Sequence, residues 1–288
     1  MSFAMDGFLS PTLDRFRASL KNVAAYKAWF EYAEELNRLG LDMLRDRDVP
    51  RHDNQRLTLA ILFVRAHKSF QSSLLLAERG LISDARVVLR SAVEGAIALN
   101  ALANDATFLD TLIEAHYYNQ RKTARLVLDD PIYRAHYSPQ QVAEMGATVQ
   151  DVDRKENAVK PRKFGDPNWA DVALKHCKDL YQTLYRLLSA DGTHTTINAI
   201  HRHVAYDANQ QISELKVGPD TSSLVETLMA ACLMLIWAAD PFARAFDLTE
   251  ITARLQQYLQ RFNELPQDEP PTVAVISGFS ENGPQAAL

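Results

Sequence analysis

"GLISDARVVLRSAVEG", residues 80–95, decides the fold, because it joins a helix boundary to a long apolar helical segment. Val, Leu and Ala fill most of its positions, but Asp84, Arg86, Arg90 and Glu94 recur along it. We call these four residues the charged line. At 100° per residue, positions 86, 90 and 94 fall within an arc of about 80°. So narrow a polar face predicts either a thin solvent-exposed strip or an internal polar cleft in which the charges are paired, Arg90 with Glu94 being one candidate pair.

Helical patterns extend outward from this stretch and predict an all-α, multi-helix bundle. Gly80 stands where a left-handed C-cap would close a helix over 52–79, and Ser83 is the expected N-cap of a helix over 84–103. The remaining helices are expected over 11–46 with a break near Gly40, from about 105 to 128, from Pro139 onward with Ser138 as N-cap, and over 169–189, 194–204, 221–246 and 249–263. Residues 205–220 read as irregular, and no β-alternation of useful length is found.

The chain of 288 residues is expected to form one bundle domain over 1–263 and a mobile acidic tail over 264–288. The tail contains four Pro and four acidic residues but no Lys or Arg. A loop or hinge is expected near 153–168, because Pro161, Gly165 and Pro167 fall there among five basic residues.

Composition excludes several classes of protein. Two distant cysteines and the absence of HExxH argue against a disulfide framework or a metal site, and no P-loop or Rossmann pattern calls for a cofactor. The apolar run "LMAACLMLIWAA" at 228–239 is shorter than the ~20 residues that span a bilayer, so we expect a core helix, no membrane partner and a cytoplasmic location. The net charge of −5 argues against extensive nucleic-acid coating but permits a local basic patch.

A polar cleft between helices is the expected functional site. The helix before the charged line carries Arg65, Lys68, Ser69 and Ser72 on one stripe, and the two stripes are expected to share a cleft with residues 169–204. Arg65, Arg86 and Arg90 would then hold a phosphate group. In "YRLLSADGTHTTINAIHRHV", residues 185–204, His194 is the candidate for proton transfer. Ser189 would position His194, and Glu94 would orient the arginines.

"GLISDARVVLRSAVE" resembles the signature of an uncharacterised bacterial helical family, which shows GL, a DA pair, and then Arg and Glu four residues apart. Members of that family commonly carry a later Ser followed shortly by His, and Ser189 and His194 fit this pattern. The resemblance covers about residues 55–205. A weaker resemblance is to HEPN domains, helical and often ribonucleolytic, in which His follows Arg after four to six residues. Here seven residues separate Arg186 from His194, which departs from the HEPN pattern.

Two functions follow from this reading. The first is recognition, with or without cleavage, of a phosphate-bearing ligand such as RNA or a nucleotide; an enzyme of this kind would be a metal-independent phosphodiesterase. The second is a non-enzymatic interaction or regulatory bundle, whose polar residues form a fixed network that sets helix register. A homodimer is compatible with both. Free arginine heads in a cleft would favour the first function, and a fully paired, closed network would favour the second.

Overall fold

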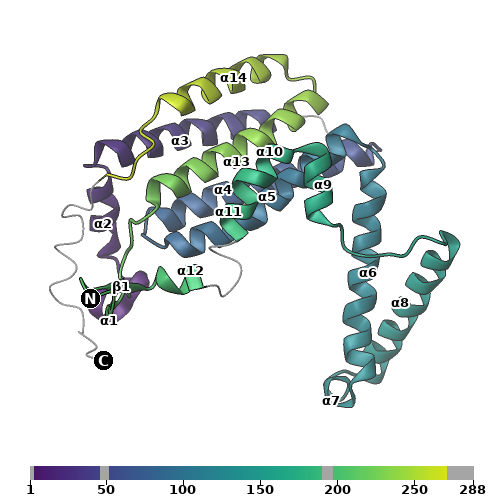
Figure 1. The fold of residues 1–288 in the computed structure, drawn as a ribbon. Helices are drawn as coiled ribbons and strands as arrows, with labels where there is room; N and C mark the ends of the chain where they lie inside the picture. Colours follow the sequence, from purple (N-terminus) through teal and green to yellow (C-terminus); the bar gives the residue numbers. More distant parts are fainter. Residues whose placement is uncertain (1–2, 46–51, 190–196, 271–288) are drawn as a thin grey trace.

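The computed structural model describes residues 3–45, 52–189 and 197–270, and it confirms the all-α fold (Figure 1). Its elements are, in chain order, α1 (Phe3–Asp6), the 3₁₀ turn η1 (Gly7–Leu9), α2 (Leu13–Leu20), α3 (Ala24–Leu44), α4 (Asn54–Ala77), α5 (Ile82–Asn104), α6 (Phe108–Asp129), α7 (Pro131–Arg134), α8 (Pro139–Ala158), α9 (Trp169–His176), α10 (Lys178–Leu180), the π-helix η2 (Tyr181–Tyr185), α11 (Arg186–Leu188), α12 (Ile197–His201), β1 (Val204–Tyr206), β2 (Ile212–Leu215), α13 (Leu224–Ala245) and α14 (Thr249–Glu264).

Helix α13 forms the centre of the bundle and contacts α3, α4, α5 and α14. It is long and apolar enough to cross a membrane by length and composition alone, but 72% of its most apolar window is buried inside the protein. Its burial against four other helices is that of a core helix, as the sequence predicted. On the other side of the bundle, α9, η2 and α11 pack against α5.

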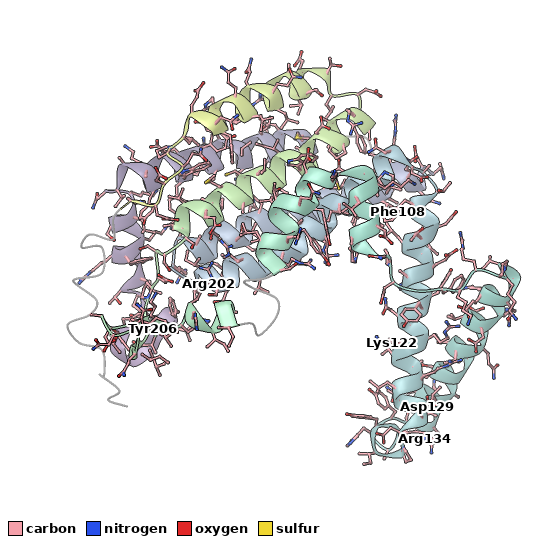
Figure 2. The ribbon with its side chains drawn as sticks, in the orientation of Figure 1. Phe108, Lys122, Asp129, Arg134, Arg202 and Tyr206 are labelled. Atoms are coloured by element: carbon pink, nitrogen blue, oxygen red, sulfur yellow. The ribbon has the colours of Figure 1, made fainter. Side chains whose placement is uncertain are left out.

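A helical hairpin projects away from this bundle (Figure 1). Helices α6 and α8 lie side by side, with α7 at the far end, and residues 159–168 lead back to the bundle (Figure 1). We call residues 108–168 the arm. Figure 2 labels Phe108 at its base, and Asp129 and Arg134 at its far end. Phe108 belongs to the main hydrophobic core, whereas the other buried apolar residues of the arm pack outside that core.

Local sequence signals fix several helix ends. Gly80 adopts φ +74°, the left-handed conformation expected after α4, and Asp53 caps the start of α4 by accepting from the Arg56 N–H at 2.9 Å. Ser138 caps α8 in a capping box with Gln141, and Pro139 occupies its first turn. Ser83, in contrast, lies inside the first turn of α5, because the helix begins one residue earlier at Ile82.

Several other predictions about the elements were wrong: the expected helix over 11–46 is interrupted between Leu20 and Ala24, and the one over 194–204 ends at His201. Gly40 does not break α3; its missing side chain makes room for His67, whose Cδ2 would lie 2.6 Å from an added Cβ. Helix α8 runs on to Ala158, so the loop begins at residue 159 rather than at 153. The predicted helix over 169–189 is divided into short segments at Cys177 and at the π-helix. Residues 205–220 include an antiparallel hairpin of β1 and β2 with an irregular register, which is the one sheet among the described residues.

The first residues of the expected mobile tail are held against the bundle. The indole N–H of Trp29 donates to the Pro266 carbonyl at 2.7 Å, and a Glu269 carboxylate oxygen accepts from the Glu226 N–H at the start of α13 at 3.2 Å. Within residues 265–270, Pro266 and Glu269 thus contact the bundle. Residues 271–288 lie outside the described part of the chain.

Candidate functional site

Arg86 of the charged line points into the bundle. Its side chain is fully buried, and its Nη1 lies 3.1 Å from a carboxylate oxygen of Glu226 and 3.5 Å from the Thr227 hydroxyl, both in the first turn of α13. A buried guanidinium needs such polar partners, because leaving its charge unpaired in the core would be costly. Arg86 therefore bonds α5 to α13. The role predicted for it, direct contact with a phosphate, requires access that this burial removes.

Arg90, one turn further along α5, points toward the α9–α11 segment. Its Nη1 lies 2.8 Å from a Glu94 carboxylate oxygen, and its Nε donates to the Ser189 hydroxyl at 2.5 Å. Its guanidinium carbon lies 3.6 Å from the centre of the Tyr185 ring, a cation–π contact. The Arg90 side chain is only 11% exposed. Arg90 thus directs its Nε and Nη1 donors and one face of its guanidinium to neighbouring residues of the protein.

Tyr185 completes this cluster, and the sequence analysis did not single it out. Its hydroxyl donates to Glu94 at 3.4 Å, and its ring stacks on Tyr181 with centroids 5.0 Å apart. Burial raises the pKa of Tyr185, Glu94 adds to the rise and Arg90 opposes it, so the phenol stays protonated and can donate. The signal that could have found it is its spacing, since Tyr185 and Ser189 are four residues apart and share a helix face. We call Arg90, Glu94, Tyr185 and Ser189 the Arg90 cluster.

The Arg90 cluster depends on a π-helical turn. Residues Tyr181–Tyr185 form this turn between the α-helical segments Lys178–Leu180 and Arg186–Leu188. Such a turn inserts one extra residue and rotates everything that follows by about a quarter of a turn, a feature often found at functional sites. Here it lies beside α5, where both Tyr185 and Ser189 contact Arg90. The turn thus lies next to the residues that contact Arg90.

The remaining predicted site residues do not join one cleft. Arg65 is exposed and donates to the Ser91 hydroxyl of α5 at 3.4 Å, away from the contacts of Arg86 and Arg90. Glu94 bonds Arg90, whereas the carboxylate on Arg86 is that of Glu226. Asp84 is exposed in the first turn of α5, where a negative charge suits the helix dipole. His194 lies outside the described residues.

Glu226 and Thr227 are further residues that sequence reasoning missed. They introduce the long apolar run of α13, and Glu226 is the last charged residue before Asp240. An isolated acid at the start of a core helix is a usable signal for a partner to a buried arginine. The pairing itself joins residues 140 positions apart, which helix periodicity cannot specify.

The arm carries a second candidate site, a groove of about 460 Å³ between α6 and α8. Ala124 and Val127, both buried, line it together with the half-buried Met145. The exposed polar side chains along it are His116, Asn119, Gln120 and Thr123 of α6 and Tyr137, which lies between α7 and α8. We call this the arm groove. Its volume falls in the range of ligand and side-chain binding pockets.

One known protein family matches this chain. The model described as "Family of unknown function (DUF5677)" matches residues 57–212, more than half of the 288 residues. The chain belongs to DUF5677. The expectation of an uncharacterised helical family is thereby confirmed, over nearly the boundaries that the sequence suggested. No curated protein and no solved structure matches the chain.

Some residues that contact the charged line lie inside the DUF5677 match, and others lie outside it. The whole Arg90 cluster and the whole arm lie within residues 57–212. Glu226, the partner of Arg86, lies beyond the match, on a helix that the DUF5677 model does not cover. The resemblance to HEPN domains stays a prediction.

Proposed function

We propose that this DUF5677 protein is a non-enzymatic interaction bundle, in which the charged line fixes the register of the helices and the arm contacts a partner. One observation carries the proposal: the heads of both Arg86 and Arg90 are engaged by residues of the bundle itself. A phosphate site needs guanidinium N–H donors that are open to the ligand. A network that uses them internally orients helices instead.

The arm supplies the surface that such a function requires. Residues 131–140 at its far end are all exposed, and they include Ile132 at 74% and Tyr133 at 51%. Leu126, in the last turns of α6, is 61% exposed. Three large exposed apolar side chains near the end of a projecting hairpin are available to contact a partner. We call Leu126, Ile132 and Tyr133 the arm tip.

The proposal is tested by ligand binding and stability measured on the same variants. Purified protein is titrated into labelled RNA and into nucleotides at low salt, with Arg90→Ala and the exposed Arg65→Ala beside the wild type. We expect no Arg90-dependent binding, and a lower free energy of unfolding for Arg90→Ala than for Arg65→Ala in urea melts. The reason is that Arg90 bonds three neighbours whereas Arg65 makes one exposed contact.

The phosphate hypothesis predicts the opposite result. Binding would weaken with salt and would be lost in Arg90→Ala. If RNA is also cleaved in the presence of chelator, His194→Ala would lower the rate by about 10²–10⁴-fold, the usual contribution of one general acid or base. Either observation, made on folded variants, would overturn the interaction proposal and restore RNA or a nucleotide as the ligand.

A further inference from the structure

The arm is too thin to bury the apolar surface that it carries. Between Leu109 and Asn168 its buried apolar residues are Ala124, Val127, Val152 and Phe164. Ion pairs rather than a core join much of the hairpin: Arg121 lies 2.8 Å from Asp153 and 2.7 Å from Glu156. Two packed helices normally complete their core against further helices, as in four-helix bundles. The arm groove and the arm tip are what remain exposed on this hairpin.

We propose that the arm pairs with the arm of a second copy of this chain, each arm tip entering the partner's arm groove. This inference rests on the proposed function, because it names the partner of the arm. Ile132 and Tyr133 lie on α7, at the far end of the arm, and the α6 residues that line the groove lie between this end and the base (Figure 1). When two arms run antiparallel about a two-fold axis that passes between tip and groove, the α7 end of each arm lies on the other arm's groove. Both contacts form together, so the assembly closes as a dimer.

The chemistry of the two surfaces matches. Ile132 is an apolar side chain suited to the groove wall formed by Ala124, Val127 and Met145. Tyr133 combines an apolar ring with a hydroxyl, which suits a groove edged by amide side chains. The helix-in-groove mode of recognition uses the same division into apolar anchors and polar edges.

Charge favours a second copy over a strongly charged partner. Residues 108–168 contain nine Lys or Arg and nine Asp or Glu, so the arm is neutral although the chain carries −5. Two arms can approach without net repulsion, and the excess negative charge stays on the rest of each chain. A nucleic acid or an acidic protein would gain no net attraction from such a surface.

The test is the oligomeric state of the full chain, measured by light scattering and sedimentation. We expect the wild type to have twice the monomer mass. Ile132→Asp, at the tip, and Thr123→Arg, in the groove, should each raise the dissociation constant of the dimer by about thirtyfold or more, as expected for a central contact residue. Both side chains are exposed, so the fold should tolerate the changes, which melts of each variant verify. Leu259→Asp, 43% exposed on α14, is the matched control and should dimerise normally.

Mixing the variants gives the decisive result. A heterodimer of Ile132→Asp with Thr123→Arg keeps one native contact and pairs the introduced carboxylate with the introduced guanidinium at the other. We expect the mixture to dimerise where each variant alone does not. A wild type that stays monomeric up to about 100 μM, where even weak homodimers associate, would overturn the inference. So would a dimer that both variants leave intact.

These outcomes are separate from those of the proposed function. A monomer that shows no Arg90-dependent RNA binding would reject the arm pairing and leave the interaction bundle standing. RNA binding that depends on Arg90 would reject the interaction bundle, whatever the oligomeric state.

Discussion

The two partners in the ion pair between α5 and α13 have very different surroundings. The Arg86 side chain is 0% exposed, whereas the Glu226 side chain is 43% exposed. Water can therefore solvate Glu226 when Arg86 is removed, but it cannot solvate Arg86 when the carboxylate is removed. The cost of breaking this pair should depend on which partner is changed.

We predict that Glu226→Gln is the more damaging substitution. It leaves the guanidinium charge in the core without the carboxylate, which should lower the free energy of unfolding by about 3 kcal/mol. Arg86→Met replaces the charge with an apolar chain of similar length and leaves Glu226 near water, so its cost should be below about 1.5 kcal/mol. Urea melts of both variants measure the difference. An equal or reversed order would show that Arg86 is not the costly partner.

His67 gives the bundle a dependence on pH. It is 3% exposed, it stacks against Phe63 and Phe70, and its Nε2–H donates to the Asn37 carbonyl at 3.2 Å. Burial lowers the pKa of His67 below 6.5, although the Asn37 hydrogen bond opposes the shift. The unfolded chain therefore takes up a proton on His67 at a higher pH than the folded protein does.

The free energy of unfolding should consequently fall as pH decreases from about 7 toward 5, and level off below the folded pKa of His67. His67→Gln, which keeps a donor for Asn37, should flatten this part of the profile. His116→Gln, on the exposed face of α6, is the control and should leave the slope unchanged. Urea melts at a series of pH values measure these slopes. A wild-type slope that persists in His67→Gln would assign it to other groups.

At the scale of elements, the arm is stabilised by a carboxylate that joins three segments. Glu156 accepts from Arg121 on α6 and from the Phe164 N–H of the returning segment, each at 2.7 Å. The hydrogen bond from Arg121 is the main cause that lowers the pKa of Glu156 from 4.5 to about 2, and burial opposes it. Because the folded pKa is depressed, this stabilisation is complete above pH 4.5 and is lost as pH falls toward 2.

We therefore predict that the amides of α6 and α8 lose protection from hydrogen exchange between pH 5 and pH 3, after correction for the intrinsic exchange rate. Glu156→Gln should show low protection already at pH 5 and little further change. Glu144→Gln alters an exposed carboxylate on the same helix, whose contact is with the Gln140 side chain, and should behave as the wild type. Arm protection that is the same in Glu156→Gln and wild type would exclude this role.

Elements with local signals were predictable from the sequence, and those set by tertiary contacts were not. Gly80 and the Ser138–Pro139 pair mark helix ends through their own backbone and side-chain chemistry. Gly40 carries the same signal as a helix break, but its cause is the approach of His67 from another helix. The strands β1 and β2 span three and four residues, too short for alternation to be recognised.

The candidate site divides in the same way. Arg90 and Glu94 lie four residues apart on one helix, so their pairing could be anticipated from spacing. Helix periodicity placed Arg86 either in an internal cleft or on a narrow solvent-exposed strip. It could not show that Glu226 forms the ion pair with Arg86. Tyr185, which contacts Arg90, is the last residue of a π-helical turn. No local residue preference predicts such a turn.

At the scale of the whole molecule, stability should be distributed in two tiers. The central helices α4, α5 and α13 share one large core, whereas the arm has four buried apolar residues beyond its base at Phe108. Opening the arm exposes little apolar surface, so it should require far less free energy than unfolding the bundle. We predict that amides in α6 and α8 exchange by local opening, with protection that hardly changes at low urea. Amides in α13 should exchange only through global unfolding, with strong dependence on urea.

If the arms pair, the stability of the arm should depend on protein concentration. A dimer that joins arm tips and grooves stabilises the closed arm by mass action, so arm protection should rise with protein concentration. Protection of α13 should change much less, and Ile132→Asp should remove the effect in the arm. Hydrogen exchange with mass spectrometry, at two concentrations on each side of the dissociation constant, measures both helices at once. Arm amides as protected as those of α13 in dilute wild-type protein would show that the arm is part of the cooperative core.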